Sequence, residues 1–446
     1  MRGTRWMLAG AMLLAAGGSA LAQQQAPVAA PTPPAPAAST GSMLPATQAL
    51  FDGYVAQKRV PGIVGAFGVG DWPTAFVASG RIAYDASAPA AGPDSLWRVY
   101  SMTKPVTAMA AMILIEEGKI GLDDPLSKYF PAFAHMRVLT SPDTSLDSRP
   151  ATKPITIREL LTHTAGLGYN INAKGPLLKE YERLGILPAQ LNAPTEAQAR
   201  AVRPTTLAEF ANRVATVPLI AEPGTTWHYS IGLDVMGAVI EKASGMPFDR
   251  FVQTRLFDPL KMTSTFWQVP AAETARFATN YAVVNGQSLP IDPAATSPYL
   301  QKPSFPYGGA GLVSSARDYD RFLHMVQDGG ILDGVRVLKP ETIALATSNL
   351  LPAGVTFTGV TPGANTNAGY GAGGYVILAD KPGVMAGTWG WDGAANTVAW
   401  ANPTRRMRGV VMVNIFPPGS LPLRAELPRA LMTDAMRMNG AAGALK

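Results

Sequence analysis

The amino-acid sequence predicts an α+β fold, an α/β sandwich in which helices flank one antiparallel sheet built from both ends of the chain. Two groups of segments predict this sheet. Near the start, residues 62–69 and 75–84 are predicted as two strands around the turn 70–73. Near the end, short segments that alternate with turn residues predict an antiparallel meander over 374–379, 383–388, 397–401 and 409–415. The mostly helical middle of the chain is therefore expected to be inserted between the two parts of the sheet.

Helices are predicted where capping residues accompany periodic apolar segments. The predicted helices cover 48–57, the segment from Ser101 to Glu117, 157 to about 166, 234–244 and 316–327. Thr156 and Glu159 match a capping box, in which each side chain bonds the backbone N–H of the other residue. Ser315 and Asp318 match a looser form of that box. Gly245 is the expected end of the fourth helix.

The first 22 residues have the pattern of a signal peptide. Arg2 and Arg5 precede an apolar run over 6–16, and Ala20-Leu21-Ala22 fits the small-x-small pattern of a cleavage site. We therefore expect an exported protein, periplasmic or secreted after cleavage near Ala22. The apolar run is shorter than the roughly 20 residues that a membrane helix needs, so no membrane span is expected.

The remaining chain is predicted to form a tether and one domain. Residues 23–42 are rich in Pro and Ala and bury too little apolar surface to fold, so they are expected to be disordered. Residues 43–440 are expected to form the domain. Its sheet part is placed at about 43–120 and 305–440, and its helical part at about 121–304.

The composition excludes several classes of function. The 446 residues carry a formal net charge of +6, with Lys and Arg scattered, so we expect no nucleic-acid partner. The chain has no cysteine, which excludes disulfides. Its four histidines lie far apart and no H-E-x-x-H motif occurs, so we expect no metal site and no cofactor. All four are predicted to be structural: His135, His163, His228 and His324. We expect His163 to bond nearby carbonyls at the end of its helix.

One segment carries a candidate nucleophile. Ser101 and Lys104 form the only S-x-x-K pattern in the chain. Residues three apart share one face of a helix, so the Lys104 amine can reach the Ser101 oxygen and act as its base. Burial and the positive end of the helix dipole favour the uncharged amine that this role needs. The alternative is that Ser101 only caps the helix, as serines at helix starts commonly do.

Two further groups could complete a site. If the Tyr229 hydroxyl lies between Lys104 and Ser101, it could take the serine proton and pass it to a leaving group. The alternative is a packed aromatic ring with a satisfied hydroxyl. The other group lies within 389–397, where small residues would let a strand edge approach a ligand, although glycine there could also mark a bulge. Its candidate binding residues are Trp391, Asp392, Gly393 and Ala394.

These three groups, in this order, resemble the motifs of the class C β-lactamase-like serine hydrolases, which include D-alanyl-D-alanine peptidases and family VIII carboxylesterases. The resemblance covers about residues 43–418, and it extends to the segments 116–125, 160–167, 223–224 and 308–315. It implies a β-lactamase/transpeptidase-like fold with the site between the sheet part and the helical part. It also implies a serine hydrolase that forms an acyl-enzyme and needs no cofactor.

The resemblance assigns roles residue by residue. The nucleophile of the family falls on Ser101, its lysine on Lys104 and its tyrosine on Tyr229. The third motif, often Lys-Thr-Gly or His-x-Gly, aligns with 391–393. The strand backbone there is implied to supply one oxyanion donor, the Ala394 N–H, and the Ser101 N–H is implied to be the other.

Two departures from the β-lactamase pattern indicate the substrate class. Ile231 stands where β-lactamases of this family generally carry asparagine, and Trp391 stands where they carry lysine. A cation would help to bind a substrate carboxylate, whereas tryptophan offers an apolar wall. We therefore expect a carboxylesterase that acts on small neutral esters.

Other functions stay open at this stage. The same family resemblance allows a β-lactamase, a D-alanyl-D-alanine peptidase or a catalytically silent peptidoglycan-binding relative. Ser230 is a rival nucleophile, because residues 228–232 resemble G-x-S-x-G. However, His228 replaces the first glycine and would crowd the tight turn that this motif needs. The sequence predicts neither the natural substrate, nor the acyl-chain preference, nor the oligomeric state.

Overall fold

The computed structural model describes residues 42–359, 367–381 and 383–444. The predicted signal peptide and nearly all of the predicted tether therefore lie outside the described residues.

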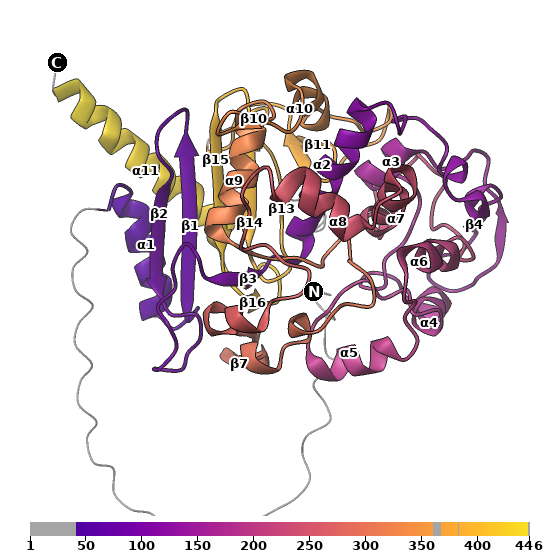
Figure 1. The fold of residues 1–446 in the computed structure, drawn as a ribbon, viewed down its shortest axis with the longest axis horizontal. Coiled ribbons are helices and arrows are strands. Elements are labelled where there is room, and N and C mark those ends of the chain that lie inside the picture. The colour runs from indigo at the N-terminus through magenta and orange to yellow at the C-terminus, as the bar shows by residue number, and fades with distance from the viewer. Residues whose placement is uncertain (1–41, 360–366, 382, 445–446) are drawn as a thin grey trace, which may run out of the picture.

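A seven-stranded antiparallel sheet forms the centre of the structure, and it joins strands from both ends of the chain (Figure 1). In spatial order its strands are β11 (Ala368–Tyr370), β12 (Tyr375–Ile377), β13 (Trp389–Asp392), β14 (Val398–Asn402), β15 (Met407–Met412), β1 (Gly62–Val69) and β2 (Ala75–Gly80). The two parts meet where β1 pairs with β15, with Val64 opposite Met412. The prediction of one antiparallel sheet built from both chain ends is confirmed.

The strand boundaries differ from the prediction at several places. The predicted strand 409–415 is divided: β15 ends at Met412, and residues 415–416 pair with residues 281–282 in another sheet. No strand forms over the described residues of 383–388, because Gly383 and Gly387 adopt φ values of +76° and +78° and turn the chain. The strand forms just afterwards, as β13. Likewise, β2 ends at Gly80 instead of continuing to Tyr84, and the chain turns away there. The short strand β11 was not predicted.

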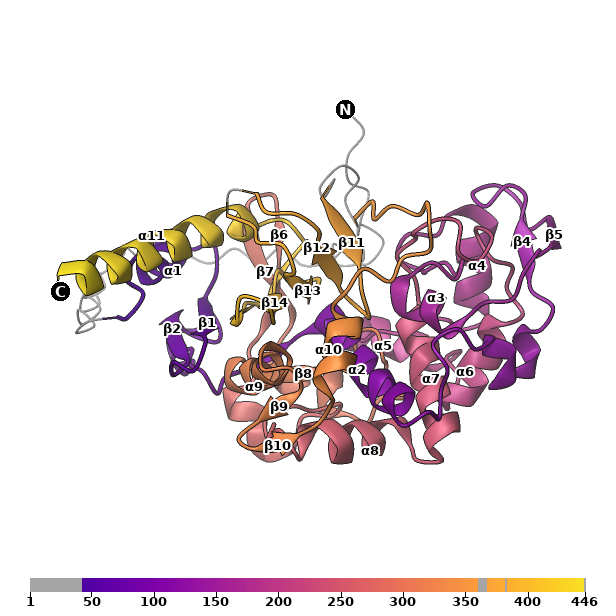
Figure 2. The same cartoon turned by 90° about the horizontal axis from the view of Figure 1, so that it is seen from above.

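Helices α1 (Pro45–Ala56) and α11 (Leu423–Ala444) cover one face of the sheet and lie side by side in Figure 2. On this face Ile63, Val77 and Val411 pack in one apolar cluster with Phe51 of α1 and Leu427 of α11. Because side chains alternate between the two faces of a strand, this face uses every second residue of β1.

The opposite face of the sheet packs on α2 (Thr103–Glu116) and α9 (Ala316–Gln327). Val64, Val410 and Met412 of the sheet belong to the same apolar core as Met109 of α2 and Phe322 of α9. The nucleophile-bearing segment is therefore held directly against the sheet.

The mostly helical part lies on the far side of α2 from the sheet (Figure 1). Its helices are α3 (Ile157–Thr162), α4 (Gly175–Arg183), α5 (Ala193–Arg200), α6 (Leu207–Val214), α7 (Gly232–Ser244) and α8 (Phe248–Val252), and α10 (Pro340–Ala346) follows later in the chain. Helix α7 contacts α2, α3, α6 and α8, so it is the central helix of this part.

Short elements complete the structure. The small sheets pair β3 (Leu96–Arg98) with β8 (Val313–Ser315), β4 (Arg137–Leu139) with β5 (Ser148–Pro150), β9 (Ile331–Leu332) with β10 (Val335–Arg336), and β6 (Asn280–Val284) with both β7 (Gln287–Asp292) and β16 (Ile415–Phe416). Single turns of 3₁₀ helix cover 100–102, 126–128, 131–133, 294–296 and 298–300, a longer 3₁₀ helix covers 271–276, and a π-helical turn covers 253–257.

The predicted helix starts at Thr156 and Ser315 and the predicted end at Gly245 are confirmed, but two other ends differ. The helix expected to reach about residue 166 ends at Thr162, and the helix expected from Ser101 begins at Thr103. Thr156 accepts the Glu159 N–H, and the Glu159 carboxylate accepts the Thr156 N–H, so the capping box is complete. The Ser315 hydroxyl accepts the Asp318 N–H at the start of α9, and α7 ends at Gly245. Among the helices within the described ranges, none combines the length and the apolar composition needed to cross a bilayer.

Candidate active site

Ser101 lies in the 3₁₀ turn Tyr100–Met102 that leads into α2, and it does not cap that helix. The residue at the N-cap position is Met102, and no side chain caps α2. Tyr100, just before the serine, has a left-handed φ of 43°, which costs about 1–3 kcal/mol for a residue other than glycine. Its hydroxyl accepts a hydrogen bond from Asn280 Nδ2 at 2.9 Å. The buried Tyr100 ring therefore anchors the turn that presents Ser101.

The structure brings Ser101, Lys104 and Tyr229 together. The Tyr229 hydroxyl donates a hydrogen bond to Ser101 Oγ at 2.6 Å, and Lys104 Nζ lies 3.4 Å from the same oxygen. Lys104 Nζ also lies 4.6 Å from the centre of the Tyr229 ring. Lys104 is fully buried and Tyr229 is nearly so, whereas Ser101 is partly accessible. The hydroxyl oxygen of a partly accessible serine thus contacts both an amine and a phenol.

The Lys104 amine is fixed by a backbone carbonyl. It donates a hydrogen bond of 2.8 Å to Gly309 O, and the Gly309 N–H donates one of 2.8 Å to Asp234 Oδ1. Asp234 is completely buried near the start of α7. Burial raises the pKa of Asp234 to about 7, although Lys104 and the Gly309 N–H oppose the shift. Gly309 must remain glycine, because a Cβ would lie 2.4 Å from Asp234 Oδ2.

Trp391 forms an apolar wall beside the group of Ser101, Lys104 and Tyr229. Its ring centre lies 5.5 Å from that of Tyr229, 5.3 Å from that of Tyr370 and 6.3 Å from that of Phe357. These aromatic rings occupy the side of the site where the family resemblance would place a lysine. The wall presents no cation to a substrate carboxylate.

Asp392 does not face the site. Because strand side chains alternate between faces, Trp391 points toward Tyr229 and Asp392 points to the opposite face of the sheet. There the Asp392 carboxylate pairs with Arg424 of α11. Burial raises the pKa of Asp392, and Arg424 opposes the shift. The alternation of side chains along a strand is the sequence signal that could have placed Trp391 and Asp392 on opposite faces of the sheet.

Gly393 and Ala394 lie in the turn that follows β13, and this turn passes the segment that carries Ser101. A Cβ on Gly393 would lie 2.5 Å from the carbonyl oxygen of Val99, so the strand end passes directly beside the residues that precede Ser101. Within the described residues, neither the Ser101 N–H nor the Ala394 N–H donates a hydrogen bond. Neither N–H group is therefore committed to another hydrogen bond within these residues.

The structure argues against Ser230 as a nucleophile. Ser230 is 1% exposed, so a substrate carbonyl cannot approach its oxygen. Its Oγ lies 2.8 Å from His163 Nδ1 and accepts the Gly232 N–H at 3.3 Å. The expectation that His163 bonds nearby carbonyls is wrong, because its ring bonds Ser230, which is 67 residues away in the chain. No local sequence signal indicates this contact.

Within the described residues, the other histidines form no hydrogen bond with the side chains of Ser101, Lys104 or Tyr229. His135 is exposed, His228 is half-buried, and His324 lies 3.2 Å from Asp328. In the part of the chain that the structure describes, no group of three or more His, Asp or Glu side chains is placed to hold a metal ion.

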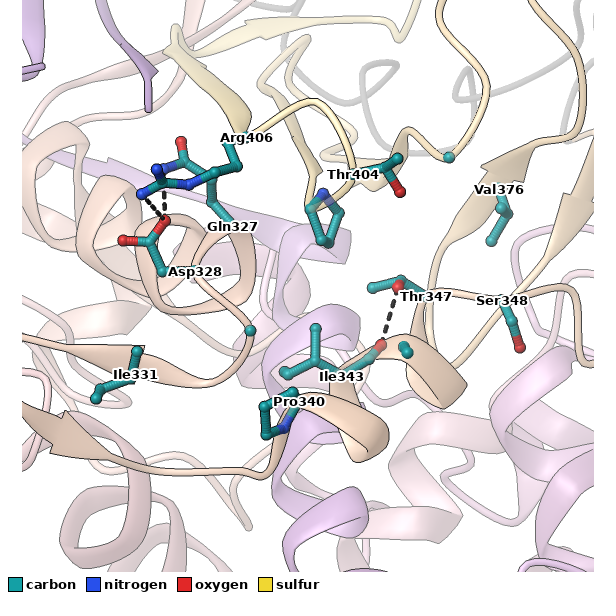
Figure 3. A pocket seen from close by; sticks show the side chains of 14 residues that line it. Gln327, Asp328, Ile331, Pro340, Ile343, Thr347, Ser348, Val376, Thr404 and Arg406 are labelled. Carbon is teal, nitrogen blue, oxygen red and sulfur yellow. Dashed lines mark hydrogen bonds and ion pairs between the residues drawn. The ribbon is translucent and has the colours of Figure 1, made fainter. Parts of the chain in front are cut away.

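A cavity of about 790 Å³ lies elsewhere, between α9, α10 and the β14–β15 turn (Figure 3). None of the catalytic residues lines it. Several of its polar side chains bond within the protein: Arg406 lies 3.1 Å from Asp328, and the Thr347 hydroxyl donates to Ile343 O at 2.8 Å. The Ser101 group, and not this cavity, is therefore the candidate catalytic site.

The fold and the serine, lysine and tyrosine around one oxygen define a serine hydrolase. More particularly, the chain belongs to the beta-lactamase family, whose family model matches residues 47–431. The family resemblance expected from the motifs is therefore confirmed.

Relatives and solved structures agree with this assignment. The esterase EstB of Burkholderia gladioli is 32% identical over 323 residues, covering 67% of this chain and 72% of EstB. Protein Rv1367c of Mycobacterium tuberculosis is 33% identical over 330 residues, covering 70% and 75%. The structure of EstCE1, described as a hydrolase with promiscuous acyltransferase activity, is 26% identical and superposes with a TM-score of 0.70 over 87% of this chain and 98% of EstCE1. The predicted fold class is confirmed.

Proposed function

We propose that this protein is a carboxylesterase in which Ser101 is the nucleophile, Lys104 the base and Tyr229 the proton shuttle. One observation carries the proposal: Ser101 Oγ lies 2.6 Å from the Tyr229 hydroxyl and 3.4 Å from the buried Lys104 amine. The similarity to an esterase, EstB, supports the choice of ester substrates.

The geometry supports a two-step reaction. Lys104, as the free amine, takes the proton of Ser101 while Oγ attacks the carbonyl carbon of the ester. The oxyanion is stabilised by the N–H groups of Ser101 and Ala394. The proton then passes by way of Tyr229 to the leaving alcohol, the carbon–oxygen bond breaks, and an acyl-enzyme remains. Water, deprotonated by the same groups, attacks the acyl carbon and releases the carboxylic acid and free Ser101.

The aromatic wall supports neutral esters over acidic substrates. Trp391, Tyr370 and Phe357 pack together beside Tyr229, and an apolar wall of this kind binds an acyl or alkyl group better than a carboxylate. We therefore expect short-chain esters of modest size to be the preferred substrates. β-Lactams and D-alanyl peptides, whose carboxylates need a cation, rank behind them.

The test compares two substrates on purified protein. We expect faster turnover of p-nitrophenyl butyrate than of a chromogenic cephalosporin, and the reverse order would overturn the esterase assignment. Ser101→Ala should abolish hydrolysis, whereas Ser348→Ala, at a half-buried serine that lines the other cavity, is the matched control. A fluorophosphonate probe should modify Ser101 alone in mass spectrometry. An unmodified protein would instead indicate a silent binding relative, and a Ser230 adduct would indicate the rival nucleophile.

A second candidate activity is acyl transfer to an alcohol. The observation that favours it is the similarity to EstCE1, whose description names promiscuous acyltransferase activity. The same acyl-enzyme would react with an alcohol in place of water. Adding butanol to the esterase assay should then yield the butyl ester, and its absence at all alcohol concentrations would restrict the activity to hydrolysis.

We also propose that the protein is exported. The basic start, the short apolar run and Ala20-Leu21-Ala22 support this proposal. Amino-terminal sequencing of the protein from a periplasmic or culture fraction should begin at Gln23.

A further inference from the structure

His163 occupies an unusual position next to the proposed proton shuttle. It ends α3 in a left-handed conformation, with φ 59° and ψ 32°, and it is 1% exposed. The centre of its ring lies 5.0 Å from that of Tyr229, with the two rings edge to face. The rings of Trp227 and Tyr370 enclose it on other sides, at 5.9 and 5.5 Å. The histidine is therefore part of the packing directly behind Tyr229.

His163 bonds both residues that flank Tyr229 in the chain. Its backbone carbonyl accepts the His228 N–H at 2.9 Å. Its ring Nδ1 accepts the Ser230 N–H at 3.2 Å and lies 2.8 Å from Ser230 Oγ. One residue thus holds the backbone before and after the tyrosine, and we call these contacts the His163 clamp.

The clamp requires a neutral histidine. Because Nδ1 accepts a backbone N–H, the ring proton must sit on Nε2. Burial, together with the nearby Lys104, lowers the pKa of His163 well below its usual range, so the ring keeps its acceptor in neutral solution.

The rest of the loop leaves the phenol free to contact the nucleophile. Asn172 Nδ2 donates to the Tyr229 carbonyl at 2.9 Å, and the Ile231 N–H donates to Gly168 O at 3.2 Å. These bonds hold the backbone only, and the Tyr229 hydroxyl bonds Ser101 Oγ at 2.6 Å. The backbone on either side of Tyr229 therefore determines where that hydroxyl lies.

We propose that His163 is a positioning residue of the active site, which fixes the Tyr229 hydroxyl against Ser101 by clamping residues 228 and 230. The proposal rests on the proposed function, since it assigns His163 a role through the proton shuttle. A proton-transfer group must stay within hydrogen-bond distance of its partner, and a displacement of about 1 Å can lower a rate by about 100-fold.

Two substitutions at position 163 distinguish the effect of losing the hydrogen-bond acceptor from the effect of losing the aromatic ring. His163→Phe keeps an aromatic ring in the cluster but removes the acceptor. His163→Asn restores an acceptor oxygen near the place of Nδ1, and asparagine tolerates the left-handed backbone. We expect His163→Phe to lower kcat for p-nitrophenyl butyrate by about 10- to 100-fold with KM nearly unchanged, and His163→Asn to recover most of that loss. His135→Phe, at an exposed histidine, is the matched control and should leave kcat unchanged.

A double-mutant cycle shows whether His163 acts through Tyr229. In a Tyr229→Phe background the hydroxyl is absent, so His163→Phe should cause little further loss of kcat. If the two losses multiply instead, or if His163→Asn is as impaired as His163→Phe, the clamp is overturned and His163 has only a packing role. If His163→Phe does not fold, judged by circular dichroism, Ser230→Ala is compared in the same cycle, because it removes the 2.8 Å contact and leaves the backbone N–H in place.

The outcomes distinguish this inference from the proposed function. A wild-type protein that hydrolyses esters, together with an unimpaired and folded His163→Phe variant, overturns the clamp alone. A wild-type protein without Ser101-dependent hydrolysis overturns the proposed function, and the clamp with it.

Discussion

Asp234 is a completely buried carboxyl group whose protonation couples the stability of this protein to pH. Burial raises its pKa from the ordinary value of 3.8 to about 7. Between these values the folded protein holds a proton that the unfolded chain has released. The stabilising contribution of the protonated form is therefore present at low pH and is lost as the pH rises toward 7. Asp234→Asn removes this titration, while its amide oxygen can still accept the Gly309 N–H.

The size of the effect follows from linkage. Each pH unit in this range changes the free energy of unfolding by about 1.4 kcal/mol, so the two units between pH 5 and pH 7 give about 3 kcal/mol. Urea denaturation of the wild type and of Asp234→Asn at pH 5, 6.5 and 8 measures this change in the free energy of unfolding. Other groups titrate equally in the two proteins, so the difference between them reports Asp234 alone. The stability of Asp234→Asn relative to the wild type should rise by about 3 kcal/mol between pH 5 and pH 8. A difference that stays constant, or that falls with pH, would refute a buried protonated carboxyl.

Two further predictions concern the strand beside the nucleophile. Gly393→Ala places a Cβ 2.1 Å from Thr397 Oγ1, so the turn after β13 must shift. Because one oxyanion donor contributes about 10²–10³, kcat should fall by about 10- to 100-fold while the protein stays folded. Gly53→Ala, where a Cβ meets nothing within 4 Å, should leave ester hydrolysis unchanged, and equal losses in both variants would exclude the oxyanion role. Arg424→Ala leaves the buried Asp392 carboxylate without its cation and should lower the free energy of unfolding by about 1–3 kcal/mol in urea denaturation. Asp392→Asn should lower the free energy of unfolding by less than Arg424→Ala does. The opposite order would show that the Arg424–Asp392 ion pair is not the source of the lost stability.

Elements with a local signal could be predicted well. Residues 62–69 form β1 with both ends as predicted, because an apolar run is bounded there by Pro61 and by Gly70. The capping residues Thr156 and Ser315 marked two helix starts correctly, since an N-cap satisfies N–H groups within three residues of itself. In each case the deciding interaction lies within a few residues along the chain.

Elements that depend on glycine conformation could not be predicted. The segment 383–388 has the apolar residues of a strand, but Gly383 and Gly387 adopt left-handed φ values and the strand β13 begins only at Trp389. A glycine in a strand and a glycine in a turn have the same local sequence signal. The surrounding structure decides between them.

In the candidate site, too, contacts within a short stretch of chain could be predicted and contacts between distant segments could not. Ser101 and Lys104 lie one helical turn apart, so their contact could be expected from spacing, while Tyr229 was placed through the family resemblance. The contact of His163 with Ser230 joins segments 67 residues apart and depends on how α3 packs beside the loop before α7. Such a contact exists only in the folded chain, which is why sequence reasoning missed it.

The pairing of β1 with β15 affects the order in which the enzyme is assembled. The turn that carries Ser101 is synthesised well before β15, the strand that pairs with β1. Contacts between distant parts of a chain also form slowly. A translation product that stops before Met407 would carry Ser101 and Lys104 but leave β1 with an unpaired edge, which favours aggregation. The seven-stranded sheet can therefore close only after β15 has been synthesised.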